Sequence, residues 1–326
     1  MDLLGAGPSR RGWRLLFCHI LCVTWRPFPL CDGAICDEKG KATGMSATDG
    51  WVYETVEEMG ARFGIRVREK LLDQQTPYQH LEVWATEHWG NLMLLDGVIM
   101  LSSLENFLYH EMMAHPALQS HAAPRDVVII GGGDCGTLSE VLRHPEVESV
   151  VQIDIDQAVT RAAERFFPEL TASNDDPRVD LRFEDGVAWM KNAPAGSCDV
   201  IIVDSTDPIG PGTGLFGPDF LADCHRVLRD DGIMVGQSES PFYHMPLMVD
   251  YHRAMKDAGF AERRSLLFPQ PVYPGGSITG TLARKTGSLD EIRPLADDIA
   301  TRYYSTALHR GLLQTPAFMR EALDAV

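Results

Sequence analysis

The sequence predicts an α/β protein in which a parallel, doubly wound sheet follows a small N-terminal antiparallel β domain. Three observations carry this prediction. Residues 51–102 show strand periodicity, strands and helices alternate from Arg125 onward, and a glycine-rich turn follows the first strand of the alternating part. Alternating strands and helices form parallel sheets, whereas successive strands joined by tight turns form antiparallel ones. A chain of 326 residues is long enough for both domains.

The first predicted domain consists of short strands followed by a connecting helix. Gln79–Ala85 alternates polar and apolar residues, as a half-buried strand does. Asn91–Leu95 and Val98–Leu101 flank an Asp-Gly pair, which is typical of a two-residue hairpin turn. Glu105–Ala117 then has helical spacing of its apolar residues, and we expect this helix to end near Pro116.

The alternating part begins with Val127–Ile130, a continuous apolar run typical of a strand buried on both faces. The further strands and helices that we expect, in chain order, are strand Val150–Ile153, helix Gln157–Phe167, strands Val179–Phe183 and Val200–Val203, helix Pro218–Leu228, and strands Ile233–Gly236, Ala261–Phe268 and Ser277–Ala283. A loop rich in proline and glycine joins the last two strands.

Residues 1–44 have the pattern of neither domain. Three arginines precede the apolar stretch Leu15–Trp25, which resembles the start of a secretory signal peptide. No small-residue cleavage site follows, and the stretch is too short to span a bilayer. We therefore expect a poorly ordered extension or a misassigned start before Met45, a β domain with its connecting helix over 45–118, and an α/β domain over 119–326. The corresponding expectation is a cytoplasmic protein without membrane attachment.

Charge and cysteine content limit the possible partners. The chain has 29 Lys and Arg residues and 46 Asp and Glu residues, which gives a formal net charge of -17. Binding to nucleic acid requires a basic face, so we expect none. An acidic cleft would suit a cationic small molecule, and an acidic surface that only keeps the protein in solution is the alternative.

The four cysteines within residues 18–36 lack the paired spacing of a zinc site, so we expect no metal.

Gly131, Gly133 and Gly136 form a G-x-G-x-x-G pattern between the first buried strand and a helix. Glycines let a ligand approach the backbone, and Asp154 at the end of the next strand can bind ribose hydroxyls. A nicotinamide or an adenosyl compound would fit equally well. A glycine-rich turn without a ligand is the alternative.

Carboxylates follow two further strands at the same edge of the sheet. Asp185 and Gly186 can contact an adenine ring, and an N-cap formed by Asp185 is the alternative. Asp204 ends the fourth strand and Asp207 follows soon after. Two carboxylates so close can hold a cationic amine, and one of them can accept its proton. The segment 208–211 contains two prolines and could form the stiff base of a lid, or only a turn.

Two other catalytic arrangements do not fit the sequence. His110 and Glu111 begin like a zinc-protease motif, but the next histidine, His115, has the wrong spacing. Ser205 lacks the G-x-S-x-G frame of a hydrolase nucleophile.

Seven motifs, taken together, resemble the spermidine synthase family between about Trp51 and about Tyr303. In order they are TPYQH at 76–80, LDG at 95–97, YHE at 109–111, GGGD at 131–134, DSTDPIGP at 204–211, QSES at 237–240 and YPGG at 273–276. The resemblance implies a methyltransferase-like, Rossmann-like catalytic domain behind the β domain, assembled as a homodimer or homotetramer. It also implies aminopropyl transfer from decarboxylated S-adenosylmethionine, a co-substrate rather than a cofactor, to a diamine. The expected acceptor is putrescine, with spermidine and methylthioadenosine as the products.

The resemblance implies a role for each matching residue. Asp204 would be the base that takes a proton from the attacking amine. The residues implied to bind the polyamine and the aminopropyl group are Tyr109, His110, Asp134, Asp207, Gln237 and Tyr273. Those implied to surround methylthioadenosine are Gln79, Asp154, Asp185, Gly186 and Pro211. An anion at Asp134 would repel the carboxylate of ordinary S-adenosylmethionine and thereby select the decarboxylated donor.

Three features depart from the family pattern and leave the acceptor open among putrescine, cadaverine, agmatine and longer amines. Asp154 stands where the family commonly has Glu, Cys135 replaces a glycine, and the run 103–106 is less charged than its counterpart. The alternative functions are an S-adenosylmethionine-dependent methyltransferase, which should not place Asp134 against its donor, and a polyamine-binding protein without catalysis. A nicotinamide dehydrogenase is a third, for which the sequence shows no hydride-transfer arrangement.

Overall fold

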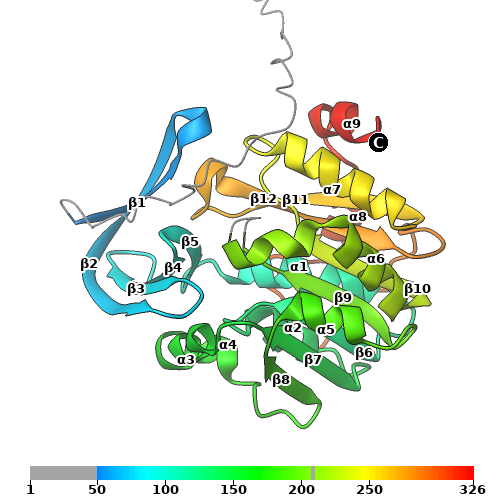
Figure 1. Ribbon diagram of the computed structural model, residues 1–326, viewed down its shortest axis with the longest axis horizontal. Helices are drawn as coiled ribbons and strands as arrows, with labels where there is room; N and C mark the ends of the chain where they lie inside the picture. Colours follow the sequence, from blue (N-terminus) through cyan, green and yellow to red (C-terminus); the bar gives the residue numbers. More distant parts are fainter. Residues whose placement is uncertain (1–49, 207–209) are drawn as a thin grey trace, which may run out of the picture. The chain divides into compact units, whose positions relative to one another are not determined.

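The structure is a computed structural model that describes residues 50–206 and 210–326, and these residues form two sheets (Figure 1). One is a five-stranded sheet of order β1-β2-β3-β4-β5, and the other is a seven-stranded sheet of order β11-β12-β10-β9-β6-β7-β8. The expected extension over residues 1–44 lies outside the described residues, as does Asp207. None of the described residues forms a helix long and apolar enough to cross a membrane.

The five-stranded sheet is antiparallel throughout, as predicted. Its elements are β1 (Trp51–Val56), η1 (Glu57–Met59), β2 (Ala61–Gln75), β3 (His80–Thr86), β4 (Asn91–Leu95) and β5 (Val98–Ser102). Asp96 and Gly97 have φ values of 50° and 84°, as the predicted two-residue hairpin turn requires. The prediction of uniformly short strands is wrong for β2, which has 15 residues. Its register against β3 shifts twice, and such bulges interrupt the regular alternation that makes a strand visible in a sequence.

The seven-stranded sheet has a parallel core, which confirms the methyltransferase-like α/β class. The parallel strands are β6 (Asp126–Gly131), β7 (Ser149–Asp154), β8 (Val179–Phe183), β9 (Cys198–Asp204) and β10 (Leu228–Gln237). The last two strands, β11 (Glu262–Pro269) and β12 (Ser277–Arg284), form an antiparallel hairpin beside β10. The chain builds β6, β7 and β8 outward and then returns to place β9 beside β6. This reversal opens a crevice at the carboxyl ends of β6 and β9, where doubly wound folds bind ligands.

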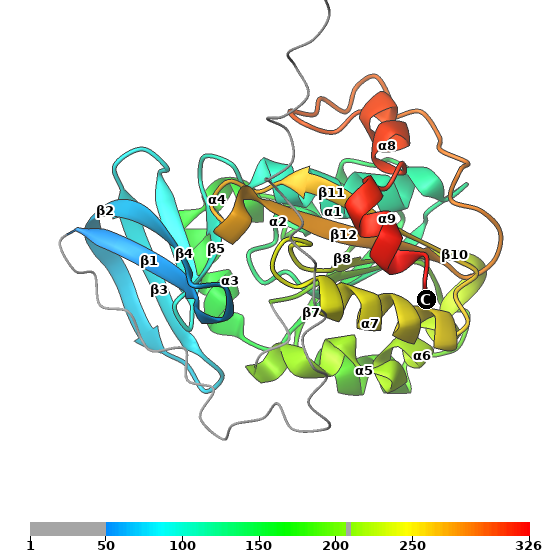
Figure 2. The ribbon, with the colours of Figure 1, turned by 90° about the horizontal axis from the view of Figure 1, so that it is seen from above.

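Helices cover both faces of the seven-stranded sheet (Figures 1 and 2). On one face lie α1 (Phe107–Ser120) and α2 (Gly136–Leu142), and on the other lie α5 (Gly186–Asn192), α6 (Pro218–Val227) and α7 (Met245–Asp257). The remaining helices are α3 (Gln157–Phe166), α4 (Pro168–Thr171), η2 (Gly210–Phe216), η3 (Pro274–Gly276), α8 (Thr306–Leu312) and α9 (Ala317–Leu323). Phe167 and Leu170 at the end of α3 and in α4 share an apolar cluster with Leu81 and Met93 of the five-stranded sheet. This cluster joins the two sheets.

Two predicted helix ends are wrong. α1 does not end near Pro116 but continues to Ser120. A proline inside a helix removes one backbone hydrogen bond, but every residue from Leu108 to Ser120 is buried, and this packing outweighs the loss. α6 ends at Val227, one residue before the predicted end, because Leu228 already pairs with Cys198 of β9 and starts β10.

Glu111 anchors the C-terminal segment to α1. Its buried carboxylate accepts the backbone N–H groups of Arg302, Tyr303 and Tyr304 at 2.7, 2.8 and 2.7 Å. A carboxylate that accepts three such bonds satisfies donors that would otherwise be buried without a partner. Glu111 therefore has a structural role, and not the catalytic role that a zinc-protease motif would predict for it.

We predict that Glu111→Gln lowers the free energy of unfolding by about 1–3 kcal/mol, because three backbone N–H groups lose their charged, buried acceptor. Urea denaturation monitored by circular dichroism measures the change. Glu148→Gln is the matched control, since the exposed Glu148 carboxylate only forms a 3.6 Å surface pair with Arg125. That control should stay within about 0.5 kcal/mol of wild type. Equal effects of the two substitutions would contradict the anchoring role.

Candidate active site

A cavity lies at the carboxyl ends of β6, β7 and β9, and its opposite wall comes from the five-stranded sheet. The lining residues contributed by the five-stranded sheet and by the loop before β3 are Gln79, Met93, Leu95, Met100 and Leu101. Of the residues predicted for the site, the following line this cavity: Gln79, Tyr109, His110, Asp134, Asp154, Asp185, Gly186, Asp204 and Tyr273. Residues that are far apart in the sequence are thus brought together at the predicted sheet edge.

Asp204 lines the cavity, and two hydroxyl groups hold its carboxylate in place. Tyr109 donates to Asp204 Oδ1 at 2.8 Å and Thr137 donates to Asp204 Oδ2 at 2.6 Å. Burial raises the pKa of Asp204 above its usual value, and the nearby charge of Asp134 raises it further. The positive charge of His110 and the two hydroxyl groups oppose this rise. The result is a fixed carboxylate that accepts a proton more readily than an exposed one.

His110 pairs with Asp134 at the same end of the cavity. The distance from His110 Nε2 to Asp134 Oδ1 is 3.2 Å, and the imidazole is 3% exposed. Burial disfavours the charged imidazole, but the adjacent Asp134 outweighs it and raises the pKa of His110 to about 9. Asp134 Oδ1 also accepts the N–H of Gly136 at 2.6 Å. His110 is therefore a cation at neutral pH, and Asp134 keeps one oxygen that neither of these bonds uses.

Asp154 ends β7 as predicted and is tied to the neighbouring Asp156. Asp154 Oδ1 accepts the N–H of Asp156 at 2.7 Å. Asp156 in turn accepts Gln79 Nε2 at 3.0 Å and Thr76 Oγ1 at 2.7 Å. Burial raises the pKa of Asp154 to about 7, with further contributions from the charges of Asp156, Asp134 and Asp204. The amide of Gln79 is thus oriented by Asp156, a residue that no motif had indicated.

Asp185 combines the two interpretations that the sequence left open. Its side chain caps α5 by accepting the N–H groups of Val187 and Ala188 at 2.8 and 3.2 Å, and it also lines the cavity beside Gly186. The cap and a position at the ligand are compatible, because a capping carboxylate still has a free oxygen.

For three of the predicted site residues, the structure shows no side chain in the cavity wall. Gln237 is buried at the end of β10 but is not among the lining residues. Asp207 lies outside the described residues, and Pro211 is described only by its backbone in η2. Conversely, Gln270 lines the cavity although it belongs to no motif. Thr137 would have been identified only by its position on the helix directly after the glycine turn.

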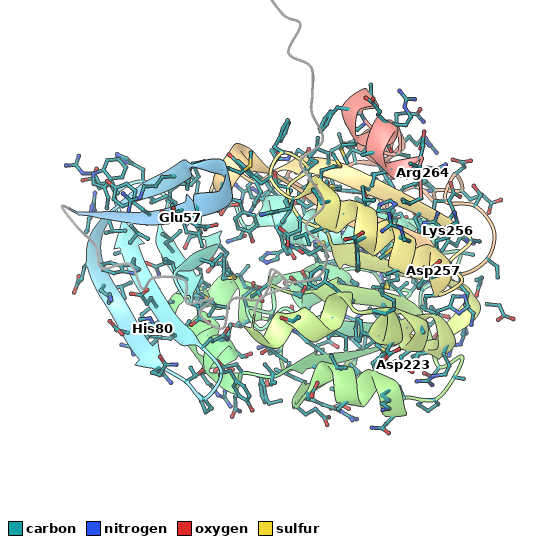
Figure 3. All side chains as sticks on the ribbon, turned by 45° about the horizontal axis from the view of Figure 1, so that its top comes forward. Glu57, His80, Asp223, Lys256, Asp257 and Arg264 are labelled. Carbon is teal, nitrogen blue, oxygen red and sulfur yellow. The ribbon has the colours of Figure 1, made fainter. Side chains whose placement is uncertain are left out.

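The charged residues of the cavity wall are mainly acidic. Its described residues include four aspartates and no lysine or arginine, and His110 is the single cation among them. By contrast, exposed charges of both signs such as Glu57, Lys256 and Asp257 project from the outer surface (Figure 3). Such a wall repels phosphates and carboxylates and attracts ammonium and sulfonium groups.

One cluster of the described residues, Asp73, His80 and Glu82, has ligand atoms close enough for a metal ion. It lies on β2 and β3 rather than at the cavity. Lys70 Nζ already lies 2.6 Å from Asp73 and 2.5 Å from Glu82, so an ammonium group neutralises these carboxylates. This charge would oppose a metal ion there.

Comparisons with known proteins agree with this geometry. The family model of the spermine/spermidine synthase domain matches residues 106–292, and that of the spermidine synthase tetramerisation domain matches residues 50–103. The chain belongs to the spermine/spermidine synthase family. It is 52% identical over 282 residues to a polyamine aminopropyltransferase of Methylococcus capsulatus, covering 86% of this chain and 99% of that protein. It is 53% identical over 283 residues to one of Alkalilimnicola ehrlichii, again covering 86% and 99%.

A solved structure also shares the fold of this chain. A crystal structure of spermidine synthase with the transition-state analogue AdoDATO has a TM-score of 0.82 and 28% identity, covering 87% of this chain and 98% of the other. The chain is therefore an aminopropyltransferase.

We predict that His110→Asn destabilises this aminopropyltransferase more at pH 6 than at pH 10. The pKa of His110 rises from 6.5 to about 9 on folding. The stability gained from the protonated imidazole is fully present below pH 6.5 and is lost as the pH rises through 9. The difference in free energy of unfolding between wild type and variant should therefore shrink by about 1–3 kcal/mol from pH 6 to pH 10. Urea titrations at both pH values measure it, and a pH-independent difference would mean that folded His110 is neutral.

Proposed function

We propose that this aminopropyltransferase moves the aminopropyl group of decarboxylated S-adenosylmethionine to putrescine, giving spermidine and methylthioadenosine. The observation that carries the proposal is the one-sided cavity, in which a fixed, buried Asp204 faces space lined by carboxylates without lysine or arginine. Both proposed substrates are cations without a carboxylate. A nicotinamide dinucleotide, whose pyrophosphate needs a neutral or positive site, fits this wall poorly.

Asp204 acts as the general base in the proposed reaction. The acceptor enters as an ammonium, pairs with the carboxylate and gives up one proton to it. The neutral amine then attacks the carbon next to the sulfonium, so that a C–N bond forms while the C–S bond breaks. The bonding electron pair stays on sulfur, which becomes the neutral thioether of methylthioadenosine. The proton on Asp204 passes to solvent after the product leaves.

The other cavity residues divide between the two substrates. Asp154, Asp185, Gly186 and Gln79 surround the adenosine part at the ends of β7 and β8, and Pro211 is assigned to the same part from its motif alone. Asp134 binds the ammonium of the aminopropyl group, and Tyr109, His110 and Tyr273 line the path of the acceptor. The assignments of Asp207 and Gln237 rest on their motifs alone. No metal is needed, because a sulfonium is already a good leaving group.

Assembly as a homodimer or homotetramer is part of the proposal, because the segment that matches the tetramerisation domain coincides with the five-stranded sheet. That sheet carries partly exposed aromatic residues with cationic neighbours: Arg62 lies 4.3 Å from the ring centroid of Tyr53, and Arg66 lies 5.8 Å from that of Trp51. Aromatic and arginine side chains are enriched at interfaces. A cytoplasmic location fits the same proposal.

We predict that Asp204→Asn lowers turnover by roughly two to four orders of magnitude, because the variant keeps the shape of the side chain but loses the base. Binding of methylthioadenosine should change less than about threefold, since that ligand is neutral. Steady-state kinetics and calorimetry measure the two quantities, with the exposed Asp324→Asn as control. Turnover within about threefold of wild type, a barrier difference below roughly 1 kcal/mol, would remove Asp204 from the mechanism.

We predict that the protein binds decarboxylated S-adenosylmethionine at least roughly tenfold more tightly than the carboxylated form, about 1.4 kcal/mol. The physical reason is repulsion between Asp134 and the donor carboxylate. Asp134→Asn should narrow the gap by improving the binding of the carboxylated form. Competition calorimetry against methylthioadenosine measures both affinities, and equal affinities in the wild type would exclude Asp134 as the selecting group.

A further inference from the structure

The turn that carries Gln79 is organised by the hydroxyl group of Thr76. Thr76 is 6% exposed and is not among the described residues that line the cavity. Its Oγ1 accepts the N–H groups of Tyr78 and Gln79 at 3.1 and 3.0 Å, and its own N–H donates to the Gln79 carbonyl at 2.9 Å. A threonine hydroxyl that binds the backbone in this way fixes the shape of a turn. The position of Gln79 in the cavity wall therefore depends on a residue outside the cavity.

Asp156 fastens this turn to the seven-stranded sheet. Its Oδ2 accepts Thr76 Oγ1 at 2.7 Å and Gln79 Nε2 at 3.0 Å, and its Oδ1 accepts the N–H of Ala158 at the start of α3 at 3.1 Å. Asp156 is 3% exposed and, like Thr76, is not among the described residues of the cavity wall. Bonds to an ionised acceptor are roughly twice as strong as bonds between neutral groups. The carboxylate of Asp156 thus uses both of its oxygens within the protein.

Asp156 also holds the acceptors that two other residues bring to the cavity. Its N–H donates to Asp154 Oδ1 at 2.7 Å. A β-carbon on Gly133 would lie 2.9 Å from Asp154 Oδ2, so the glycine leaves room for this oxygen. Because a carboxylate only accepts hydrogen bonds, Asp156 binds the NH₂ end of Gln79 and turns the amide oxygen away from itself. Gln79 and Asp154 both line the cavity, where they offer acceptors to hydroxyl groups.

We propose that Thr76 and Asp156 are positioning residues that set the affinity of the cavity for the ribose of the donor. The inference rests on the proposed function, in which Gln79 and Asp154 contact the adenosine part. Acceptors that are already held in place lose less conformational freedom when they bind hydroxyl groups, so binding is tighter. Asp154 ends β7 and Asp204 ends β9, with β6 between them. The pair therefore acts on donor binding and not on the proton transfer at Asp204.

The test compares adenosine with dideoxyadenosine, which lacks both ribose hydroxyls. Calorimetric titrations give the two affinities, and the wild type should bind adenosine at least about tenfold more tightly. Thr76→Val keeps the shape of the side chain without its hydroxyl. It should reduce this ratio below about threefold by weakening adenosine, with dideoxyadenosine unchanged within about twofold. Asp156→Asn can still cap α3 but loses a charged oxygen, so it should reduce the ratio likewise.

Steady-state kinetics separates positioning from a general loss of structure. In both variants KM for decarboxylated S-adenosylmethionine should rise at least about threefold, while kcat stays within about twofold of wild type. Thr76→Ser restores a hydroxyl group and should return both the KM and the binding ratio to within about twofold of wild type. Because the two residues act through one hydrogen bond, the double variant should weaken adenosine by less than the product of the single effects.

Two control variants lie in the same sheet. Thr86 is also 6% exposed, and its hydroxyl donates to the Gly90 carbonyl at 2.7 Å and accepts the N–H of Trp89 at 2.8 Å, so it organises its own turn. Thr86→Val should keep the full ratio. Asn91→Leu removes the 2.8 Å bond from Asn91 Nδ2 to the Phe166 carbonyl, which joins the sheet to α3 by another route. It should keep the full ratio as well.

The proposal is overturned if Thr76→Val keeps the wild-type ratio, if it weakens both nucleosides equally, or if a control variant causes the same ribose-specific loss. A wild type that binds both nucleosides equally would also refute it, because no side chain would then bind the ribose hydroxyls. If Asp156→Asn folds poorly, the comparison of Thr76→Val with Thr76→Ser decides, and if Thr76→Val folds poorly, Asp156→Asn decides.

The proposed function is examined separately by the mass of the products formed from decarboxylated S-adenosylmethionine and putrescine. Absence of spermidine with the wild type would refute that function, whereas the nucleoside ratio reports on ribose positioning alone. Spermidine formation with an unchanged ratio in Thr76→Val would refute only the positioning role.

Discussion

The position of Asp204 depends on how closely the ends of β6 and β9 approach each other. Gly131 pairs with Asp204 across the two parallel strands, and the N–H of Gly132 donates to the Asp204 carbonyl at 2.8 Å. A β-carbon on Gly131 would lie 2.1 Å from that carbonyl oxygen, and one on Gly132 would lie 2.8 Å from Asp204 Oδ2. Both glycines also have positive φ values. The glycine turn therefore serves first to place a carboxylate, whereas a similar turn in a dinucleotide-binding fold makes room for a pyrophosphate.

The second constraint is electrostatic. Several carboxyl groups share a buried space with one cation, His110. Burial raises the pKa of Asp204 and of Asp154, and the charge of Asp134 raises both further. Such an arrangement is unfavourable in the empty protein, and a cationic ligand relieves it. An ammonium near Asp134 would remove part of the repulsion that acts on Asp204 and so lower its pKa. The donor would thereby leave Asp204 better able to hold a second, incoming ammonium.

Much of this site could be predicted because parallel strands end at one edge. Once the sequence indicated that Gly131, Asp154 and Asp204 stand at the ends of parallel strands, the topology alone required these residues to converge. A helix over Glu105–Ala117 was also predicted, but not its continuation past Pro116 to Ser120, because burial against the sheet is a tertiary effect. The hydroxyl donors to Asp204 show the same limit: Tyr109 belongs to a motif, whereas Thr137 is an ordinary helix residue.

Gln270 and Glu105 could not be found from the sequence for a different reason. Neither has a periodicity or a spacing that distinguishes it from other loop and turn residues. Gln270 lines the cavity, and Glu105 is buried next to its side chain. No pattern along the chain records such neighbours in space. The role of Glu111 was hidden similarly, because its three partners lie in a distant C-terminal segment.

The contact between the two sheets and the position of the Asp154 carboxylate depend on the same residue, Asp156. Asp156 accepts from Thr76 and Gln79 of the smaller domain, while its own N–H fixes the Asp154 carboxylate that faces the cavity. A second tie, from Asn91 Nδ2 to the Phe166 carbonyl at 2.8 Å, keeps α3 against the same domain. The five-stranded sheet therefore does more than cover the cavity. Because Asp156 joins both sides, a shift of the five-stranded sheet would move Gln79 and disturb Asp154 together. The packing of the two sheets therefore sets the geometry of the cavity around Gln79 and Asp154.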